Sequence, residues 1–352
     1  MGGHALFVWR RYPPPLFLGG AEISHALLAE SLAEAGWTVS YLGSYEDPFP
    51  PGADRLTELL EALKDNRAAV EFDDARRTLT YTLGRVSCHA VPQAAIESQM
   101  HRLLREGDVT LAVTAQEGSA EISAALAGRT RVVGWLHSVT PTGLEVLAGA
   151  PAVALATSDF VAGIATRHAA TGTSLHRFYP PFRRPATVEP RATFADAITM
   201  VNPIPSKGVA VFLEVARRLA DRRFVAQEAW YPVRPQTTSN VEVRAKSPDL
   251  DRLISETRLL LVPSAAPEGF GRVVVDFGLR GVPAVVHDIG GLREAAGSSA
   301  LLLPTLHADD WVTAVASLDD RAAYGAAAED ARSHSARFLR DCVAELSAIG
   351  VL

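Results

Sequence analysis

A loop over residues 263–272 carries residue types suited to binding a phosphorylated ligand. It reads Pro-Ser-Ala-Ala-Pro-Glu-Gly-Phe-Gly-Arg, follows a predicted buried strand and opens a predicted helix that runs to about residue 280. Gly269 and Gly271 allow the backbone to approach a ligand, and free amides at a helix start attract an anion such as a diphosphate. Glu268 lies beside them, and Asp276 could accept hydrogen bonds from a diol such as a ribose. The alternative is a glycine-bearing loop with two solvated carboxylates.

A second segment of this kind contains a lysine. Residues 199–208, Thr-Met-Val-Asn-Pro-Ile-Pro-Ser-Lys-Gly, are typical of a strand, a tight loop and a helix start. A lysine near a helix start opposes the helix dipole unless an anion binds there too. Of the 34 Lys and Arg residues only Lys64, Lys207 and Lys246 are lysines, so Lys207 is not easily dismissed as filler. The alternative is an exposed lysine before a helix-starting glycine.

Four further segments indicate a site more weakly. Gly19 and Gly20 precede the first long helix, where a plain tight turn explains them equally well. His137 ends a predicted strand, and a lone histidine there is more often a partly buried structural residue. Residues 290–294, Gly-Gly-Leu-Arg-Glu, open another helix, with helix capping as the alternative. Residues 249–251, Asp-Leu-Asp, resemble a metal-binding pattern, but they start a helix, so capping is the better interpretation.

Strands and helices that would position these residues alternate along the chain. Short apolar runs separated by helical patterns indicate β-α-β units and parallel sheets. The first helix is predicted over residues 20–35 and ends at Gly36, which can adopt the left-handed conformation. Residues 78–83 could add a strand, although their alternation is ambiguous. Predicted strands cover residues 6–9, 39–42, 109–114, 132–136 and 153–157, and then 198–201, 223–226, 241–243, 259–262, 284–287 and 301–303.

A Pro- and Arg-rich stretch over residues 179–185 interrupts this alternation and is typical of an interdomain linker. We therefore expect an α/β protein with two doubly wound, Rossmann-like domains that face a cleft. The domains are predicted over residues 1–182 and 183–335, with a C-terminal helix in 336–352 that packs back on the first domain. Ligands of open α/β sheets bind at the carboxyl ends of the strands, so function is expected in the loops that follow them.

Composition excludes several classes of protein. The chain has 352 residues, 48% hydrophobic and 21% charged, which is an ordinary globular composition with the length of two domains. A net charge of −6 and a pI near 5.9 argue against nucleic acid or an acidic bilayer as the main partner. No apolar stretch is long enough to span a membrane, and no secretory signal is evident, so a cytoplasmic location is expected. Cys88 and Cys342 make neither a disulfide framework nor a thiolate zinc site.

Missing motifs narrow the chemistry further. The sequence has no GxxxxGK[ST] loop, no GxGxxG after the first strand, no GxSxG and no HExxH. Kinase, dehydrogenase, hydrolase and zinc-enzyme interpretations therefore lose most of their support.

Taken in order, these segments resemble one family, the retaining GT-B glycosyltransferases of family 4 (group 1). The resemblance covers about residues 5–305 and is strongest over 200–294. In that family a nucleotide diphosphate sugar binds mostly to the C-terminal domain and the acceptor mostly to the N-terminal one. The segments that carry it are 19–22 (GGAE), His137, 158–162 (SDFVA), 205–208 (PSKG), 263–271 with a carboxylate eight residues after its Glu, and 290–294 (GGLRE).

The resemblance implies a role for each candidate residue. Lys207 would stabilise the charge that builds on the donor diphosphate, Glu268 would hold sugar hydroxyls, and His137 would line the reaction centre. Asp276 would bind the nucleotide ribose. In the family model the acceptor attacks on the leaving-group face and a phosphate oxygen takes its proton, so no metal or cofactor is required. Besides the catalytic His137, Lys207 and Glu268, the expected donor-binding residues are Gly19, Gly20, Asn202, Gly208, Gly269, Phe270, Gly271, Arg272 and Asp276.

Two positions depart from the family's pattern. The second carboxylate is Asp276 where the family usually has Glu, one methylene longer. Asn202 stands in the region where the family commonly has Arg, and a neutral amide cannot supply a second positive charge, although Arg272 could compensate. These departures leave a second hypothesis open, namely that the protein is a non-catalytic GT-B module that binds a nucleotide or assists a partner enzyme. A sugar-nucleotide epimerase is a third alternative, with less support.

The charged residues of the region 55–77 indicate which type of acceptor to expect. Its basic residues are interspersed with acidic ones, unlike the basic amphipathic segment of membrane-surface relatives. We expect a small soluble acceptor, such as a specialised metabolite, a donor of the UDP or GDP type, no nucleic-acid partner and no strong membrane association. The acidic residues are Glu58, Glu61, Asp65, Glu71, Asp73 and Asp74.

Overall fold

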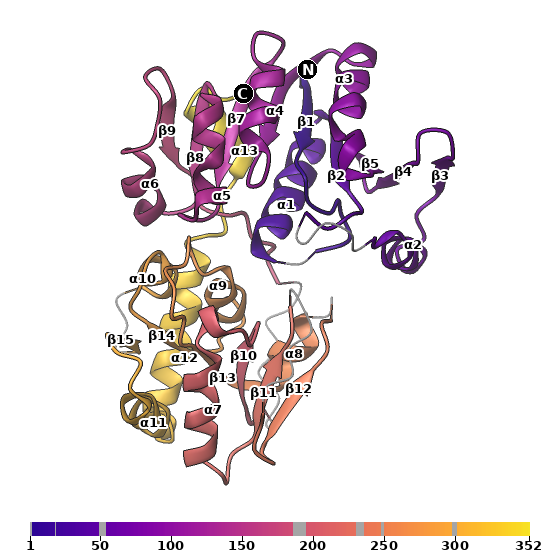
Figure 1. Ribbon diagram of the computed structural model, residues 1–352. Helices are drawn as coiled ribbons and strands as arrows, with labels where there is room; N and C mark the ends of the chain where they lie inside the picture. Colours follow the sequence, from indigo (N-terminus) through magenta and orange to yellow (C-terminus); the bar gives the residue numbers. More distant parts are fainter. Residues whose placement is uncertain are drawn as a thin grey trace. The chain divides into compact units, whose positions relative to one another are not determined.

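In the computed structural model the chain divides into two units, which Figure 1 shows. Met1–Pro181 and Asp341–Leu352 form one unit, and Phe182–Arg340 forms the other. The structure describes residues 2–17, 19–48, 54–185, 195–229, 236–247, 250–297 and 301–352. Of the Asp-Leu-Asp segment, Asp249 lies outside the described residues, so its predicted capping role stays a prediction.

The first unit is built on one sheet, which among the described residues has nine strands in the order β3-β4-β5-β2-β1-β6-β7-β8-β9. The order reverses between β1 and β6, so the loops that follow these two strands are neighbours. The strands are β1 (His4–Val8), β2 (Thr38–Ser44), β3 (Val70–Asp73), β4 (Thr78–Leu83), β5 (Val86–Val91), β6 (Val109–Thr114), β7 (Arg131–Leu136), β8 (Val153–Ala156) and β9 (Ser174–Arg177). The helices are α1 (Gly20–Glu34), α2 (Leu56–Asp65), α3 (Ile96–Glu106), α4 (Ser119–Leu126), α5 (Pro141–Leu144), α6 (Asp159–Ala165) and α13 (Cys342–Ala348), with 3₁₀ turns η1 (Gln93–Ala95) and η2 (Glu145–Gly149).

Strand β1 illustrates how both faces of this sheet are buried. Ala5 and Phe7 join a hydrophobic cluster with α1, whereas Leu6 and Val8 join another with α3 and α4. All four side chains are fully buried. Burial on both faces is the reason that β1 is a continuous apolar run, as is typical of a central parallel strand.

The C-terminal helix α13 belongs to the first unit. Cys342 and Leu346 of this helix, with Val351 beyond it, join the cluster that contains α1. Figure 1 shows the helix, in yellow, among the N-terminal elements. The Asp341 side chain caps its start by accepting two backbone N–H bonds. The end of the chain is thus part of the N-terminal core.

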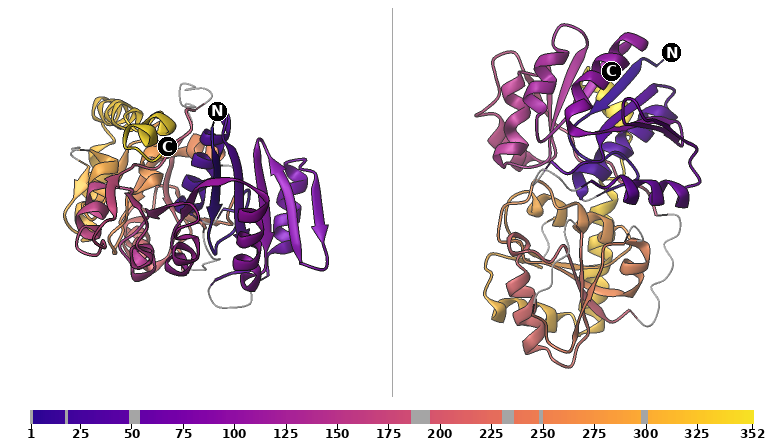
Figure 2. Two further views of the ribbon diagram at one scale, coloured as in Figure 1. Left: turned by 90° about the horizontal axis from the view of Figure 1, so that it is seen from above. Right: turned by 45° about the vertical axis from the view of Figure 1, so that its right-hand side comes forward.

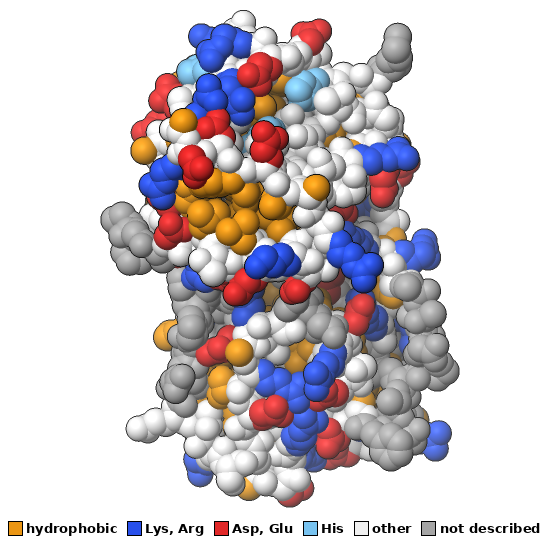
Figure 3. All heavy atoms as spheres, turned by 90° about the vertical axis from the view of Figure 1, so that its right-hand side faces the viewer, with side chains coloured by type: hydrophobic (Ala, Val, Ile, Leu, Met, Phe, Trp, Pro, Cys, Tyr) orange, Lys and Arg blue, Asp and Glu red, His pale blue; other side chains and the backbone are white. Residues whose placement is uncertain are grey.

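An antiparallel hairpin lies at one edge of the same sheet. β3 pairs antiparallel with β4, and β4 pairs antiparallel with β5 (Figure 2). Val70 and Phe72 of β3 are 47% and 41% exposed, and Figure 3 shows hydrophobic side chains gathered on the side of this unit that carries α2 and the hairpin. The sheet is therefore mixed at this edge, where the sequence predicts parallel strands.

The second unit has a smaller, parallel sheet, for which the described residues give the order β12-β11-β10-β13-β14-β15. Here the order reverses between β10 and β13. Ile198 and Met200 of β10 pack into a cluster with α7 and α11. The strands are β10 (Ala197–Val201), β11 (Phe224–Gln227), β12 (Val241–Arg244), β13 (Thr257–Val262), β14 (Ala284–His287) and β15 (Leu302–Leu303). The helices are α7 (Val209–Arg218), α8 (Leu250–Glu256), α9 (Arg272–Gly278), α10 (Leu292–Ala296), α11 (Ala308–Ser317) and α12 (Arg321–Ala336), with the 3₁₀ turn η3 (Pro205–Lys207).

The predicted strands are confirmed to within about two residues, and residues 78–83 are strand β4. The first predicted helix is α1, and Gly36 beyond it has a φ of 90°, as expected for a left-handed helix end. The helix predicted to reach residue 280 ends at Gly278. Sequence analysis missed β3, β5 and β9.

Candidate active site

The loops after β10 and β13 form the candidate site of the second unit. The two strands pair in parallel, so their carboxyl ends lie side by side where the strand order reverses. Ligands of open α/β sheets bind at such points. The predicted residues on these loops are Asn202, Lys207, Gly208, Glu268, Gly269, Phe270 and Gly271.

Gly208 allows the two loops to touch. The chain leaves β10, makes the turn η3 and begins α7 immediately after Gly208. Gly208 has a φ of 78°, and a Cβ there would lie 1.8 Å from the carbonyl oxygen of Pro263. Glycine meets both conditions, because it has no Cβ and adopts positive φ readily. The lysine-bearing loop therefore packs directly on the start of the other loop.

Backbone hydrogen bonds fix the loop that carries Glu268. The amides of Ala265 and Ala266 donate to the Ser206 carbonyl at 3.0 and 3.1 Å. From another direction, the Gly291 amide donates to the Glu268 carbonyl at 2.8 Å. The Gly-Gly turn before α10 thus packs against this loop and helps to hold it in place.

Lys207 and Glu268 form an ion pair across the two loops. Lys207 Nζ lies 2.6 Å from Glu268 Oε2, and the two side chains are 24% and 14% exposed. The other carboxylate oxygen, Oε1, accepts a hydrogen bond from the hydroxyl of the buried Ser264. His287, at the end of β14, donates from Nδ1 to the Ser264 carbonyl at 2.6 Å. A cation and a fixed carboxylate are therefore adjacent, an arrangement suited to a ligand that carries both a phosphate and hydroxyl groups.

Asn202 brings no charge to these loops. It has a φ of 61° and a buried side chain, and its backbone N–H donates to the Gln227 carbonyl at 2.7 Å. Within the described part of the chain its side-chain oxygen has no hydrogen-bond partner. Residues 202–208 and 263–271 contain one basic side chain, Lys207, so this lysine supplies the positive charge of both loops.

Arg272 and Asp276 lie further along, one turn apart on α9. Arg272 Nε is 3.4 Å from Asp276 Oδ2, and its guanidinium lies 4.3 Å from the ring centroid of Phe182. Burial raises the pKa of Asp276, and the charge of Arg272 partly offsets this effect. Arg272 is thus engaged by its own neighbours, and its compensation for Asn202 stays a prediction.

The ring of Phe270 anchors the second loop. It is 4% exposed and lies 6.2 Å from Phe182 and 5.1 Å from Phe338 between ring centroids. Because the side chain is committed to this aromatic cluster, a ligand could reach Phe270 only through its backbone.

In the first unit, His137 follows β7 and lies against a group of stacked rings. Its ring centroid is 4.6 Å from Trp135 and 5.1 Å from His25. His25 of α1 stacks on Trp9 at 4.3 Å and on Trp135 at 5.0 Å. His25 is fully buried, and neither ring nitrogen has a hydrogen-bond partner among the described residues. Burial, aided by the charge of Arg11, lowers the pKa of His25 to about 3, so the ring is uncharged.

An ionic cluster with two buried carboxylates holds the Gly19 amide, where α1 begins. Glu22 Oε2 accepts a hydrogen bond from the Gly19 amide at 3.1 Å, and its Oε1 accepts one from Arg11 at 3.1 Å. Arg11 also donates two bonds of 2.7 Å to the two oxygens of Glu117, in the loop after β6. Burial opposes the charge of Arg11, but the bonds and charges of Glu117 and Glu22 outweigh it and raise the Arg11 pKa. This cluster clamps the loop after β1 to the loop after β6.

Sequence analysis missed Arg11, Glu117, His25 and Ser264. Arg11 and Glu117 each follow a buried strand within three residues, so a search for polar residues after every strand could have found them. The importance of His25 and Ser264 depends on burial, for which the sequence holds no signal.

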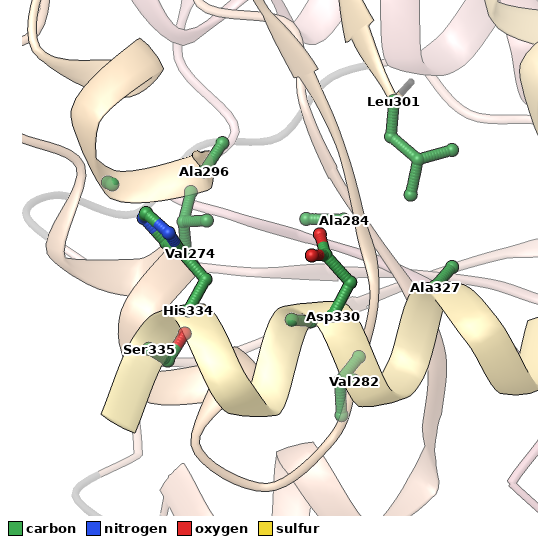
Figure 4. Close-up of a pocket in the computed structure, with 11 residues that line it drawn as sticks. Val274, Val282, Ala284, Ala296, Leu301, Ala327, Asp330, His334 and Ser335 are labelled. Carbon is green, nitrogen blue, oxygen red and sulfur yellow. The ribbon is translucent and has the colours of Figure 1, made fainter. Parts of the chain in front are cut away.

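A small pocket in the second unit lies apart from these loops. It is bounded by α9, α10, α12 and β14, with Asp330, His334 and Ser335 of α12 facing Val274 and Ala284 (Figure 4). None of the predicted site residues lines it.

Across the described ranges, no helix has the length and apolar character needed to cross a membrane. The same residues contain no group of three or more His, Cys, Asp or Glu placed to hold a metal ion.

Known proteins resemble this chain in sequence over part of the second unit and in structure over both units. Residues 195–320 match the family model described as glycosyl transferases group 1. Sucrose-phosphate synthase from Thermosynechococcus elongatus has a similar structure, with a TM-score of 0.72 and 14% identity over 99% of this chain and 98% of that one. HepE from Anabaena, in complex with UDP-glucose, aligns with a TM-score of 0.70 and 15% identity over 98% and 100% of the two chains. The catalytic domain of starch synthase IV from Arabidopsis thaliana, bound to ADP and acarbose, aligns with a TM-score of 0.67 and 11% identity over 99% of this chain and 100% of that one. No curated protein sequence matches the chain.

The class of the protein follows from these findings. The fold is GT-B, with two Rossmann-like domains, as predicted. The family match adds the activity, since residues 195–320 form a glycosyltransferase domain and contain both loops of the candidate site. The protein is a glycosyltransferase.

Proposed function

We propose that this enzyme moves a sugar from a nucleotide diphosphate sugar, of the UDP or GDP type, to a small soluble acceptor, with retention of configuration and without a metal or other cofactor. The observation that carries the proposal is the Lys207–Glu268 pair, which lies at the strand-order reversal of a glycosyltransferase domain. A cation beside a carboxylate fits a diphosphate beside a hydroxyl-bearing sugar. The UDP-glucose bound in the similar HepE structure supports a donor of this kind.

The proposed reaction breaks the bond between the anomeric carbon and a diphosphate oxygen. Lys207 stabilises the negative charge that develops on the leaving diphosphate. Glu268 accepts hydrogen bonds from sugar hydroxyls, and Asp276 accepts them from the ribose. The acceptor oxygen then bonds to the anomeric carbon on the same face, and its proton passes to an oxygen of the leaving phosphate.

The remaining predicted residues complete this proposal. Backbone groups of Gly208 and residues 269–272, with the Asn202 amide, contact the donor. On the first unit His137 lines the reaction centre, and Gly19 and Gly20 allow their loop to approach the diphosphate and the acceptor. A soluble acceptor fits the mixed charge of residues 55–77 and the net charge of −6.

Replacing the lysine tests the proposal directly. Lys207→Ala should lower the turnover of the nucleotide-sugar donor by about 10²-fold, the scale of losing one electrostatic donor. Lys64→Ala, an exposed lysine on α2, is the matched control and should leave turnover unchanged. The donor would first be selected by thermal shift with UDP, GDP, dTDP and ADP, since a ligand at 100 times its Kd stabilises by about 2.7 kcal/mol. Near-normal turnover of Lys207→Ala would contradict the assignment.

Two measurements on the wild-type enzyme test the finer parts. EDTA should leave the rate unchanged, and a strict requirement for added metal would refute metal independence. NMR of the product should show the anomeric configuration of the donor, and inversion would refute retention.

Asn202 favours a second candidate, a nucleotide-binding module without transferase activity. The neutral amide leaves Lys207 as the basic side chain of the two loops, which weakens the expected diphosphate site. Nucleotide binding without transfer or hydrolysis across a broad acceptor panel would support this candidate. Product analysis without any acceptor would reveal an epimerase.

A further inference from the structure

The Lys207–Glu268 pair has a consequence for the ligands that the site accepts. Lys207 Nζ lies 2.6 Å from Glu268 Oε2, while Glu268 Oε1 accepts the hydroxyl of Ser264. The positive charge that should attract a diphosphate is therefore already neutralised by a carboxylate in direct contact with it. An anion that binds Lys207 also meets the negative charge of Glu268.

The two loops that carry the pair cannot easily move apart. The two loops are joined by the bonds from Ala265 and Ala266 to the Ser206 carbonyl, 3.0 and 3.1 Å long. Gly208 packs against Pro263 without room for a Cβ. The two charged side chains are thus anchored on one rigid backbone assembly, and Glu268 stays beside any group that binds Lys207.

We propose that Glu268 makes the site discriminate between the intact nucleotide-sugar donor and the free nucleoside diphosphate. This inference rests on the proposed function of the same site. When Lys207 turns to a phosphate, Glu268 loses a charged partner and needs new hydrogen-bond donors. The sugar of an intact donor supplies hydroxyls next to the diphosphate, whereas a free diphosphate supplies none. Glu268 therefore weakens binding of the product and favours its release.

The test compares two ligands on matched variants. Isothermal titration would give the Kd of UDP and UDP-glucose, and of GDP and GDP-mannose, for the wild type and Glu268→Gln. The glutamine keeps the shape of the side chain and removes its charge. Asp288→Asn is the control, because Asp288 is a carboxylate paired with Arg293 in the loop after the neighbouring strand β14. Thermal unfolding would verify that each variant is folded.

We expect Glu268→Gln to bind the free nucleoside diphosphate at least tenfold more tightly than the wild type does, and the nucleotide sugar no more tightly. The control should change neither Kd by more than twofold. Product inhibition of transfer should increase in Glu268→Gln for the same reason. Unchanged or weaker binding of the free diphosphate in Glu268→Gln would overturn the inference alone, while a wild type that binds none of these ligands would overturn the proposed function as well.

Discussion

The two units place an ion pair at the same topological point and build it differently. In the first unit Arg11, after β1, pairs with Glu117, after β6. In the second, Lys207, after β10, pairs with Glu268, after β13. Each pair thus joins the two loops at which the strand order of its sheet reverses.

The two ion pairs differ in the chemistry of their cations. Arg11 makes two parallel bonds to Glu117 and a third to Glu22, and these two carboxylates are 9% and 1% exposed. A planar guanidinium held in this way is fixed, and the cluster acts as a clamp. Lys207 is as exposed as Arg11, at 24%, but it is a compact ammonium on a flexible stem and its partner Glu268 is 14% exposed, so it can turn to a ligand. Similar topology thus carries a stabilising clamp in one unit and, in the other, the pair that we propose for ligand binding.

Removing each cation should break this comparison most clearly. Arg11→Met leaves Glu22 and Glu117 buried without their cation, and we expect a loss of about 3–5 kcal/mol in the free energy of unfolding. Lys207→Met should cost less, about 1 kcal/mol, because the single carboxylate left behind, Glu268, is 14% exposed and keeps the hydrogen bond from Ser264. Urea unfolding measures both values. Equal losses in the two variants would show that the clamp and the exchangeable pair are not distinct.

A methyl group at Gly208 tests whether the second site depends on the close approach of its loops. Gly208→Ala places a Cβ against the Pro263 carbonyl at a positive φ, and we expect a loss of about 3 kcal/mol, together with weaker nucleotide binding. Gly325→Ala on α12 is the control, since nothing lies within 4 Å of its Cβ, and it should gain about 0.5–1 kcal/mol. Unfolding curves and nucleotide titrations measure these effects. A fully stable Gly208→Ala that binds nucleotide normally would remove the argument for tight loop contact.

The buried ring of His25 gives the first unit a pH dependence. Its pKa is about 3 in the folded chain, so below pH 6.5 the unfolded chain takes up a proton that the folded chain refuses. Stability should therefore fall with pH between 6.5 and about 3, by about 1.4 kcal/mol per pH unit from this group. His25→Phe keeps an aromatic ring against Trp9 and should remove this contribution. Burial also lowers the pKa of His89 to about 4. His89 is present in the wild type and in His25→Phe, so it contributes the same pH dependence to the stability of both.

Unfolding measured in steps from pH 7 to pH 4 would test this prediction. The difference in stability between wild type and His25→Phe should change with pH at the stated slope. A constant difference across that range would mean that His25 is not buried as an uncharged ring.

Sequence patterns predicted the central strands well and the edge strands poorly. β1 and β13 are buried on both faces, so each appears as a short apolar run. β3 is Val-Glu-Phe-Asp with no buried residue, and its pairing with β4 is its main support. A strand without a buried face leaves too little pattern for prediction.

The same contrast applies to the sites. Glycines and a scarce lysine after apolar runs were enough to select Lys207 and Glu268. Arg11 could not be selected in the same way, because it is one of 31 arginines and its neighbour Arg10 is another. Only its contacts with two buried carboxylates distinguish it.

The sequence by itself determined the alternation of strands and helices, the positions of the loops and the residue types that each loop presents. Those features depend on local backbone preference and on apolar periodicity. The tertiary structure alone decided that Lys207 meets Glu268 across 61 positions and that Arg11 meets Glu117 across 106. Strand order determines which loops become neighbours, and the number and burial of the carboxylates around a cation determine how firmly it is held. Both arise from contacts between residues far apart in the chain.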